Sequence, residues 1–541
     1  MQISIYTKTL GMIFHFKHNI IYLFLSGYRA KDGEPIRIGE VKILKKEQTE
    51  EDGIQLKCGD LAFLNKDFCS LGQSLDYYER ISSLNEDEKI FILNALNDVI
   101  YNPQIKKSFE NEPGWKISLM RGISESDDIF LLSPYLISKD YSSIPSIELK
   151  LSFYNESMKK PVVFDFDSPS YGYFENEKLP CRINVLVGQN GSGKSSILSK
   201  ISRVAFSSSK DRTSKALTKV GTIEPLGIGF PKIISVSYSA FDSFKIPGVS
   251  LGEKKQILSD IVSNRGRYIF CGIRDINKEL EDYIKRFSNV EMDVLPDDEI
   301  INDRLESTTL KSISTLQGEI AELLTLIERK KRIRAFKRII SILFKELSFK
   351  EIKAILLVSI DIKTLPDLFF ECSTGHKFVI HSLMNIIAHA EKRSLILMDE
   401  PETHLHPPLL AVFMTAIREA LREFDSFCIV ATHSPIVVQE TLRRHVHIVR
   451  RFGGQMDLIS PEIETYGESL STITTLVFSL TGEFTEYHQE LDNITDFYIE
   501  TGKKDSPETI YNNIESAFGN DLSMQARSYV MSRIIASHRG L

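Results

Sequence analysis

The eight residues from Gly188 to Ser195 follow the pattern G-x-x-x-x-G-K-[ST] in full, between an apolar run at 183–187 and a helix-like run at 196–206. In this strand–loop–helix context, N–H groups of the loop and of the first helical turn converge and can hold phosphate oxygens. Lys194 would place its charge at the β- and γ-phosphates, and the Ser195 hydroxyl is placed to ligate Mg²⁺. The sequence therefore predicts a triphosphate site with Mg²⁺. Its predicted binding residues are Gly188, Asn190, Gly191, Ser192, Gly193, Lys194, Ser195 and Ser196.

Two adjacent carboxylates supply the second half of the predicted site. The apolar run at 394–398 is typical of a buried strand and is followed directly by Asp399 and Glu400. Asp399 is expected to hold Mg²⁺, directly or through water. Glu400 is then placed to orient and polarise the attacking water as a general base. Because these residues lie far from Lys194 in the sequence, a long insertion must separate the two halves.

Two further motifs lie on either side of the carboxylates. Ser373 and Gly375 precede a helical run, and a Ser-x-Gly at a helix N-terminus offers a hydroxyl and N–H groups to an anion. The segment resembles the signature motif of ABC-type ATPases, L-S-G-G-Q, from which Cys372 and His376 depart. A later strand-like run ends at His433, which matches the switch histidine that senses the γ-phosphate in those ATPases. A lone histidine at a strand end is otherwise more often structural.

Taken together, these motifs resemble the SMC/RecF-like branch of ABC ATPases over residues 144 to 450. The resemblance implies ATP and Mg²⁺ as cofactors, Glu400 and His433 as catalytic residues, and a homodimer or higher homo-oligomer. In that family the signature motif completes the phosphate site of the other subunit, so Ser373 and Gly375 would act in trans. The resemblance also favours a loop at the subunit interface for 402–407, over a metal site at its histidines. A Q-loop glutamine is not evident, and 239–242 occupies its place.

A narrower resemblance is to PtuA, the ATPase subunit of Septu-type and retron-associated anti-phage systems. It implies an HNH nuclease partner (PtuB-like) and, in retron versions, a reverse transcriptase with its RNA–DNA hybrid. The tail after His433 lacks the glutamate and D-x-D carboxylates of a Toprim nuclease domain, so we expect the chain itself to cut nothing. The residues that carry this resemblance are 76–78, 94–98, 237–242, 373–376, 402–407 and 466–469.

The composition is that of a soluble globular protein with two or three domains. The chain has 541 residues, 42% hydrophobic and 26% charged, with a net charge of −7, so it has no global basic signature for nucleic acid. The six cysteines include no C-x-x-C pair, which is typical of reduced thiols in a cytoplasmic protein. His15, Lys17 and His18 interrupt the apolar stretch at 10–27, so no membrane segment is predicted. The residues before Met12 are expected to be poorly ordered.

The pattern of elements predicts an α/β fold: an ABC-type ATPase head with a mixed sheet and an antiparallel β-subdomain, a helical insertion and a helical C-terminal tail. Antiparallel strands are expected at 146–153 and 162–167, further strands at 233–238 and 267–273, and helix at 76–100. The expected domains are an N-terminal mixed α/β region (1–140), the first ATPase lobe with the phosphate loop (141–276), the helical insertion (277–360), the second lobe with the remaining motifs (361–460) and the helical tail (461–541).

The amphipathic stretch 322–345 leaves one functional question open. It carries seven clustered basic residues, which indicate either a solvated helix face or a contact with DNA, RNA or an acidic partner. The second interpretation would favour a DNA-repair or chromosome-maintenance ATPase that acts directly on DNA. A scaffold that binds ATP but hardly hydrolyses it is a third class, against which the intact Glu400 argues. The basic residues are Arg329, Lys330, Lys331, Arg332, Arg334, Lys337 and Arg338.

Overall fold

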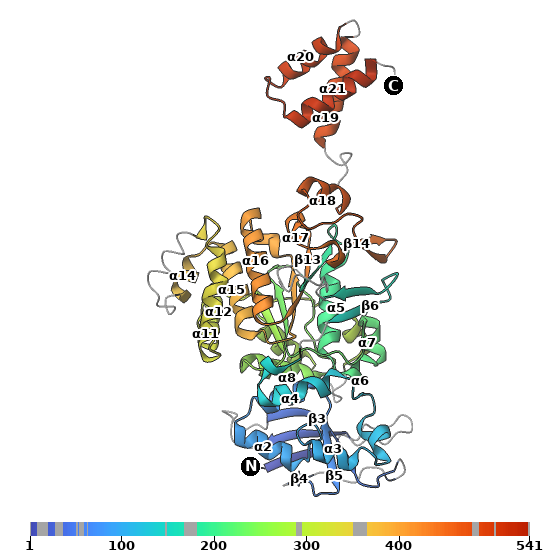
Figure 1. Cartoon of the computed structure of the whole chain (residues 1–541), viewed down its shortest axis with the longest axis vertical. Helices are drawn as coiled ribbons and strands as arrows, with labels where there is room; N and C mark the ends of the chain where they lie inside the picture. The colour runs from blue at the N-terminus through green and yellow to red at the C-terminus, as the bar shows by residue number, and fades with distance from the viewer. Residues whose placement is uncertain are drawn as a thin grey trace, which may run out of the picture. The chain divides into compact units, whose positions relative to one another are not determined.

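The computed structural model describes residues 2–7, 20–26, 36–49, 52, 59–61, 63–145, 149–166, 181–287, 295–349, 365–478, 486–502 and 505–538. The chain divides into two compact units, Met1–Leu470 and Ser471–Leu541. The first unit contains an N-terminal α/β region and the large sheet that carries the sequence motifs (Figure 1).

The N-terminal region is an antiparallel five-stranded sheet, of strand order β4-β1-β2-β3-β5, with helices packed against it. Tyr77, Tyr78 and Trp115 are buried in its core. The segment expected to be poorly ordered before Met12 contains β1, which pairs with both β2 and β4, whereas its other residues lie outside the described ranges. The elements are β1 (Gln2–Thr7), β2 (Ile20–Ser26), β3 (Ile36–Lys45), β4 (Gly59–Leu61), β5 (Phe68–Gly72), α1 (Leu75–Ser82), α2 (Glu86–Ala95), α3 (Pro103–Phe109), η1 (Trp115–Leu119), α4 (Asp128–Ser138) and η2 (Tyr141–Ser143).

The helix expected at 76–100 is two helices, α1 and α2. Asn85 begins α2 with a capping box, in which its side chain accepts from the N–H of Glu88 and the Glu88 side chain accepts from the N–H of Asn85. Such a reciprocal cap satisfies two backbone donors that a helix start leaves unpaired, and it fixes a new start inside an otherwise helical pattern.

The large sheet has seven strands in the order β11-β10-β12-β13-β8-β14-β15, all parallel except for the edge strand β15. The three-stranded antiparallel sheet, β7-β6-β9, confirms the predicted β-subdomain. The strands are β6 (Lys150–Tyr154), β7 (Val162–Asp165), β8 (Ile183–Val187), β9 (Thr222–Glu224), β10 (Ile233–Ser237), β11 (Tyr268–Gly272), β12 (Leu395–Asp399), β13 (Phe427–Thr432), β14 (Val446–Phe452) and β15 (Gln455–Ile459).

Helices cover both faces of this sheet, and the fold class predicted from the sequence is confirmed (Figure 1). The central strands β8, β12 and β13 are rich in apolar residues and almost completely buried, as expected for parallel strands covered on both faces. Leu395 and Leu397 of β12 pack into the same core as Ile197 and Ile201 of α5, whereas α15 contacts β10 and β11. The helices are α5 (Lys194–Phe206), α6 (Ser209–Arg212), α7 (Lys215–Val220), α8 (Leu251–Val262), α15 (Thr374–His389), η4 (Pro401–His404), α16 (Pro407–Glu423), α17 (Pro435–Gln439) and η5 (Arg443–His445).

The described part of the stretch between β11 and β12 consists of helices joined by loops, and the basic stretch at 322–345 is divided between two helices. The break falls at Lys331, whose φ is 58°. Lys330 and Arg332 bind Glu391 at 2.6 and 2.5 Å, and Arg338 pairs with Glu419 at 3.3 Å. Three of the seven basic side chains are therefore engaged within the chain, whereas Arg329, Lys331, Arg334 and Lys337 are exposed. The helices are α9 (Ile276–Arg286), α10 (Asp297–Ile301), α11 (Ile313–Arg329), α12 (Ile333–Leu343) and α14 (Leu365–Glu371).

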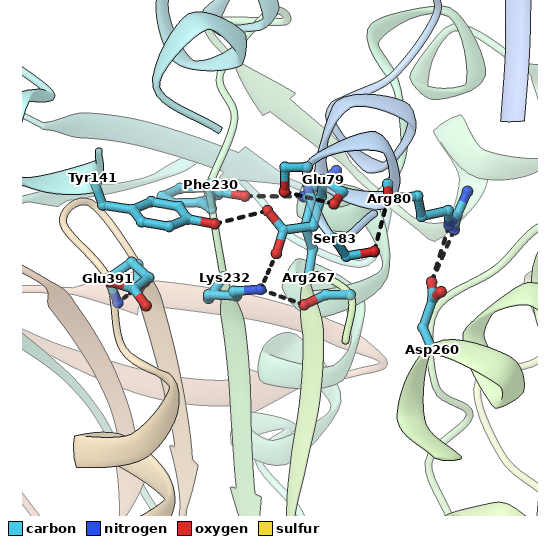
Figure 2. A network of polar contacts seen from close by, with 12 residues as sticks. Glu79, Arg80, Ser83, Tyr141, Phe230, Lys232, Asp260, Arg267 and Glu391 are labelled. Carbon is cyan, nitrogen blue, oxygen red and sulfur yellow. Dashed lines mark hydrogen bonds and ion pairs between the residues drawn. The ribbon is translucent and has the colours of Figure 1, made fainter. Parts of the chain in front are cut away.

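A buried network of polar contacts joins the N-terminal region to the ends of β10 and β11 (Figure 2). Glu79 of α1 accepts from the Tyr141 hydroxyl at 2.9 Å and pairs with Lys232, whose Nζ also donates to the carbonyl of Gly266 at 2.6 Å. Arg80 of α1 pairs with Asp260 at 3.1 Å beside this network. Because each buried charge has a partner, α1 is fixed to the base of the large sheet.

The second unit folds around its own small core. Leu491, Ile510 and Ile514 pack with Val530 and Ile534, which is the amphipathic arrangement of a three-helix unit. In the described ranges, none of the helices combines the length and the apolar character needed to cross a bilayer. The C-terminal helices are α18 (Leu470–Leu476), α19 (Glu486–Thr501), α20 (Pro507–Ala517) and α21 (Met524–His538).

A candidate nucleotide-binding site

The predicted motifs meet because four parallel strands end at one edge of the sheet. Asp399, the last residue of β12, is in register with Ser237 of β10 and Ala431 of β13. Thr432, which precedes His433, is in register with Val187, which precedes the phosphate loop. The carboxyl ends of parallel strands at such an edge are where open α/β sheets bind their ligands. The fold thus brings the two halves of the predicted site together.

The phosphate loop has the backbone geometry of an anion cradle. Gly191 and Gly193 have φ values of 78° and 106°, which side-chain-bearing residues rarely adopt. Helix α5 follows at once, and no side chain caps it, so its first N–H groups remain available to phosphate. The buried Ser192 hydroxyl has no hydrogen-bond partner, which also fits a loop shaped for a polar ligand. A Cβ at Gly188 would lie 2.4 Å from the carbonyl oxygen of Val449, so β14 presses directly on the loop.

Lys194 is buried against the loop. Its Nζ donates to the carbonyl oxygens of Gly188 and Gln189 at 2.9 and 3.1 Å. Burial lowers the pKa of Lys194, and the carboxylates of Glu400 and Asp399 act in the opposite direction. The Lys194 ammonium group thus lies at the loop near these two carboxylates. A bound phosphate would pair with the ammonium group, and a metal ion would pair with the carboxylates.

Ser195 and Asp399 form the direct link between the two halves of the site. The Ser195 hydroxyl donates to Asp399 Oδ1 at 2.8 Å. The pKa of Asp399 is raised to about 7, and burial is the largest cause. The nearby carboxylates of Glu400 and Asp242 also raise this pKa, whereas the hydrogen bond from Ser195 lowers it. A divalent cation would relieve this concentration of negative charge. The hydroxyl and carboxylate oxygens fit Mg²⁺, which prefers hard oxygen ligands and retains several waters.

Glu400 and His433 lie beside this pair. Glu400 has a φ of 43°, a left-handed conformation that is uncommon for a residue with a long side chain and is often retained at functional sites. His433 Nδ1 lies 3.9 Å from Glu400 Oε1 and 3.0 Å from Glu402 Oε1. Glu402 also accepts from the N–H of His433 at 2.6 Å. Glu402 therefore fixes the position and ring orientation of the histidine.

The signature-like segment caps helix α15. The Ser373 side chain accepts from the N–H of His376, and Gly375 lies in the first turn. A Cβ at Gly375 would lie 2.7 Å from the carbonyl oxygen of His404, so glycine is needed where α15 meets η4. The contacts described for Ser373 and Gly375 are with these neighbours, whereas those of Lys194 and Ser195 are with the phosphate loop and Asp399. Among the described contacts, Ser373 is therefore not bonded to the phosphate loop of its own chain.

Helix α15 is also held by a buried charge at its middle. His381 Nε2 lies 3.0 Å from Glu319 Oε2 of α11, and its Nδ1 contacts the hydroxyl of Tyr238, which follows β10. Burial alone would lower the pKa of His381, but Cys271 and Glu319 raise it to about 9. The imidazolium form thus links α15 to the insertion and to β10.

We expect this pair to make stability depend on pH. The folded-state pKa of His381 lies above its ordinary value of 6.5, so its contribution is full below pH 6.5 and is lost as the pH rises through about 9. The contribution is on the order of 3 kcal/mol. The difference in melting temperature between the wild type and His381→Gln should shrink from pH 6 to pH 9.5. A difference that stays constant over this range would contradict a charged His381.

The structure places two more of the predicted residues and adds three that the sequence does not indicate. Ser196, a predicted phosphate-binding residue, donates its hydroxyl to Asp303 Oδ2 at 2.8 Å, and Asn190 is exposed on the loop. Asp303, Glu402 and Val449 contact the site, although the sequence marks none of them in that role. Glu402 alone had an available signal, since it lies two residues after Glu400 in a segment already singled out.

Comparison with known proteins supports the nucleotide site. Residues 183–439 match the family model described as "AAA domain, putative AbiEii toxin, Type IV TA system". Protein ea59 of Escherichia phage lambda is 27% identical over 537 residues, which are 95% of this chain and 93% of that protein.

Two solved structures are also similar to the chain. One is the ADP conformation of an ATP-binding cassette of an ABC transporter, at 12% identity and a TM-score of 0.27, over 61% of this chain and 95% of that one. The other is the SMC head domain from Thermotoga maritima, at 17% identity and a TM-score of 0.26, over 58% and 99%. The match to the AAA-domain model extends from β8 to α17 and therefore includes the phosphate loop, Asp399, Glu400 and His433.

Proposed function

We propose that this protein is an ATP-binding and ATP-hydrolysing regulatory subunit that controls a partner nuclease in an anti-phage defence complex. The observation that carries the ATPase part is the 2.8 Å hydrogen bond between Ser195 and Asp399, because it unites two motifs that the chain keeps far apart. Glu400 and His433 adjoin it at the edge of the sheet. This is the arrangement that triphosphate hydrolysis requires.

In the proposed reaction, the loop N–H groups and Lys194 hold the phosphates, and Ser195 and Asp399 hold the metal ion. Mg²⁺ would neutralise charge on the β- and γ-phosphate oxygens. Glu400 accepts the proton of a water that attacks the γ-phosphorus, while the bond to the bridging oxygen of ADP breaks. His433, oriented by Glu402, donates a hydrogen bond to the γ-phosphate. The products are ADP and phosphate.

We further propose that two copies of the chain enclose ATP between them. The support is that Ser373 caps a helix whose N–H groups suit an anion, and that its described partner is His376, whereas the described partners of Lys194 are Gly188 and Gln189. A second copy would bring this helix end to the phosphate site. ATP binding then closes the homodimer, and hydrolysis opens it.

The nuclease partner and the defence role rest on the narrower resemblance and on the family description. That description names a toxin and a type IV TA system. The tail is built of helices α18 to α21 where it is described. We therefore assign cutting to a partner of the HNH type, with a reverse transcriptase and its RNA–DNA hybrid as a further partner in retron versions. The relative that is 27% identical to the chain is itself a phage protein.

Direct action on DNA is the second candidate function. It is favoured by the exposed side chains of Arg329, Lys331, Arg334 and Lys337 around the start of α12, which would suit a phosphate backbone. Against it, two of the three remaining basic residues of this stretch, Lys330 and Arg332, are paired with Glu391. In this case ATP turnover should rise with DNA, and the rise should weaken steeply with salt.

One experiment separates these functions. The purified chain with Mg²⁺ and ATP should leave plasmid DNA intact, and cleavage should appear when an HNH nuclease of the PtuB type is added. A Lys194→Ala chain should alter that cleavage, while exposed Lys215→Ala serves as the matched control. Robust cleavage by the chain alone would overturn the proposal. ATP turnover that DNA stimulates without any partner would favour the second candidate.

A further inference from the structure

The helical insertion reaches the phosphate site through one carboxylate. Asp303 lies between α10 and α11, and its Oδ2 accepts the hydroxyl of Ser196, the residue after the predicted metal ligand, at 2.8 Å. We call residues 302–311 the strap. Their backbone follows the segment after β10, since the Lys245 N–H donates to the carbonyl of Asp303 at 2.8 Å and the Leu305 N–H to that of Ser243 at 2.7 Å.

Electrostatics also hold the strap on α5. Burial lowers the pKa values of Lys200 and Arg203, which follow Ser196 along α5, and the carboxylate of Asp303 opposes both changes. Arg203 also donates to a carbonyl oxygen of α10, that of Ile300. The Asp303 carboxylate thus lies near the Ser196 hydroxyl and the side chains of Lys200 and Arg203. It connects the strap to the start of α5.

The Ser196 hydroxyl has a single hydrogen to donate. Ser196 lies in the first turn of α5, the helix end that faces the phosphates, so a phosphate oxygen and Asp303 require the same hydrogen. A phosphate would also repel the carboxylate. We propose that Asp303 is a positioning residue that competes with bound nucleotide for Ser196, so that nucleotide binding releases the strap from α5. This inference rests on the proposed ATP binding and adds its coupling to the insertion.

The strap leads to the helix that holds the signature-like segment. The strap continues into α11, where Glu319 pairs with His381 of α15. Ser373 is the residue that caps the start of α15. At the other side, Arg274 pairs with Asp242 at 3.2 Å and bonds to Glu279 of α9 at 2.6 Å. Release of the strap at Asp303 would therefore alter the position of α15 through α11. The phosphate loop and the signature-like segment of one chain are joined by this route.

The test uses the full-length chain, a fluorescent ATP analogue and hydrogen–deuterium exchange. In the wild type, ATP should speed exchange of the Leu305 amide several-fold, because its bond to Ser243 opens. Ser196→Ala loses the bond to the phosphate as well as the bond to Asp303, so it should bind ATP more weakly than the wild type, and its Leu305 exchange should be fast at the outset and insensitive to ATP. Asp303→Asn, which lacks the competing charge, should bind the analogue about fivefold more tightly. The exposed Asp297→Asn on α10 should match the wild type.

The outcomes separate this inference from the proposed function. If the wild type fails to bind the analogue, the nucleotide site itself is wrong. If the wild type binds it but ATP leaves the exchange of the strap unchanged and Asp303→Asn has wild-type affinity, the competition is excluded. Should Asp303→Asn fail to fold, Ser196→Ala removes the same hydrogen bond from the other side, and unchanged strap exchange in that variant would overturn the inference.

Discussion

Replacing Lys194 with alanine is expected to lower the affinity for ATP by at least about 100-fold, because a buried charge-assisted contact with the phosphates is lost. In the structure the Lys194 Nζ lies within the loop, bonded to the carbonyl oxygens of Gly188 and Gln189. The ammonium group is therefore already at the place where the β- and γ-phosphates would bind. Equilibrium titration with a fluorescent ATP analogue measures the effect.

The control must separate loss of binding from loss of fold. Lys215→Ala removes an exposed lysine from the neighbouring helix α7 and should leave ATP affinity unchanged. Thermal unfolding of both variants shows whether the domain remains intact. A folded Lys194→Ala chain with wild-type affinity would remove the phosphate loop as the nucleotide site.

Replacing Glu400 with glutamine is expected to reduce the rate of ATP hydrolysis about 10²- to 10⁴-fold while ATP binding persists. Glutamine preserves the size and hydrogen-bonding groups of the side chain but cannot accept a proton from water. The Glu400 carboxylate is the one close to both His433 and the Ser195–Asp399 pair. Phosphate release under single-turnover conditions measures the chemical step directly.

Two further variants serve as controls for the Glu400→Gln result. Glu281→Gln changes an exposed glutamate on α9 and should hydrolyse ATP at the wild-type rate. Glu402→Gln weakens the support of His433 without removing the base, so its rate should fall less than that of Glu400→Gln. If Glu400→Gln hydrolyses ATP normally, Glu400 is not the general base.

The phosphate loop and the two carboxylates could be predicted because each lies in a short sequence pattern that is typical of one local structure. The glycines, Lys194 and Ser195 are consecutive, and Asp399 and Glu400 terminate an apolar run, so short segments are enough to place them on a strand end and a helix start. Their meeting could also be expected, because parallel strands align their carboxyl ends. The structure adds the register that makes this contact, in which Asp399 lies beside Ala431.

The other residues of the site are brought together by contacts between segments that are far apart in the sequence. No local sequence pattern indicates such contacts. Asp303 is an ordinary loop aspartate until the fold places it against Ser196, and Val449 approaches Gly188 only because β14 pairs with β8. The basic stretch suggested one helix, yet Lys331 adopts a left-handed conformation and its neighbours turn inward to Glu391. Charge content alone therefore could not separate structural ion pairs from an exposed surface.

The composite site between two copies is the central claim, and the solution mass of Glu400→Gln tests it most directly. Light scattering after size-exclusion chromatography should give the chain mass of 61.6 kDa without nucleotide and twice that mass with Mg²⁺ and ATP. Adding Lys194→Ala to Glu400→Gln should abolish the change. A mass that stays the same while Glu400→Gln is saturated with ATP would contradict a site completed by a second chain.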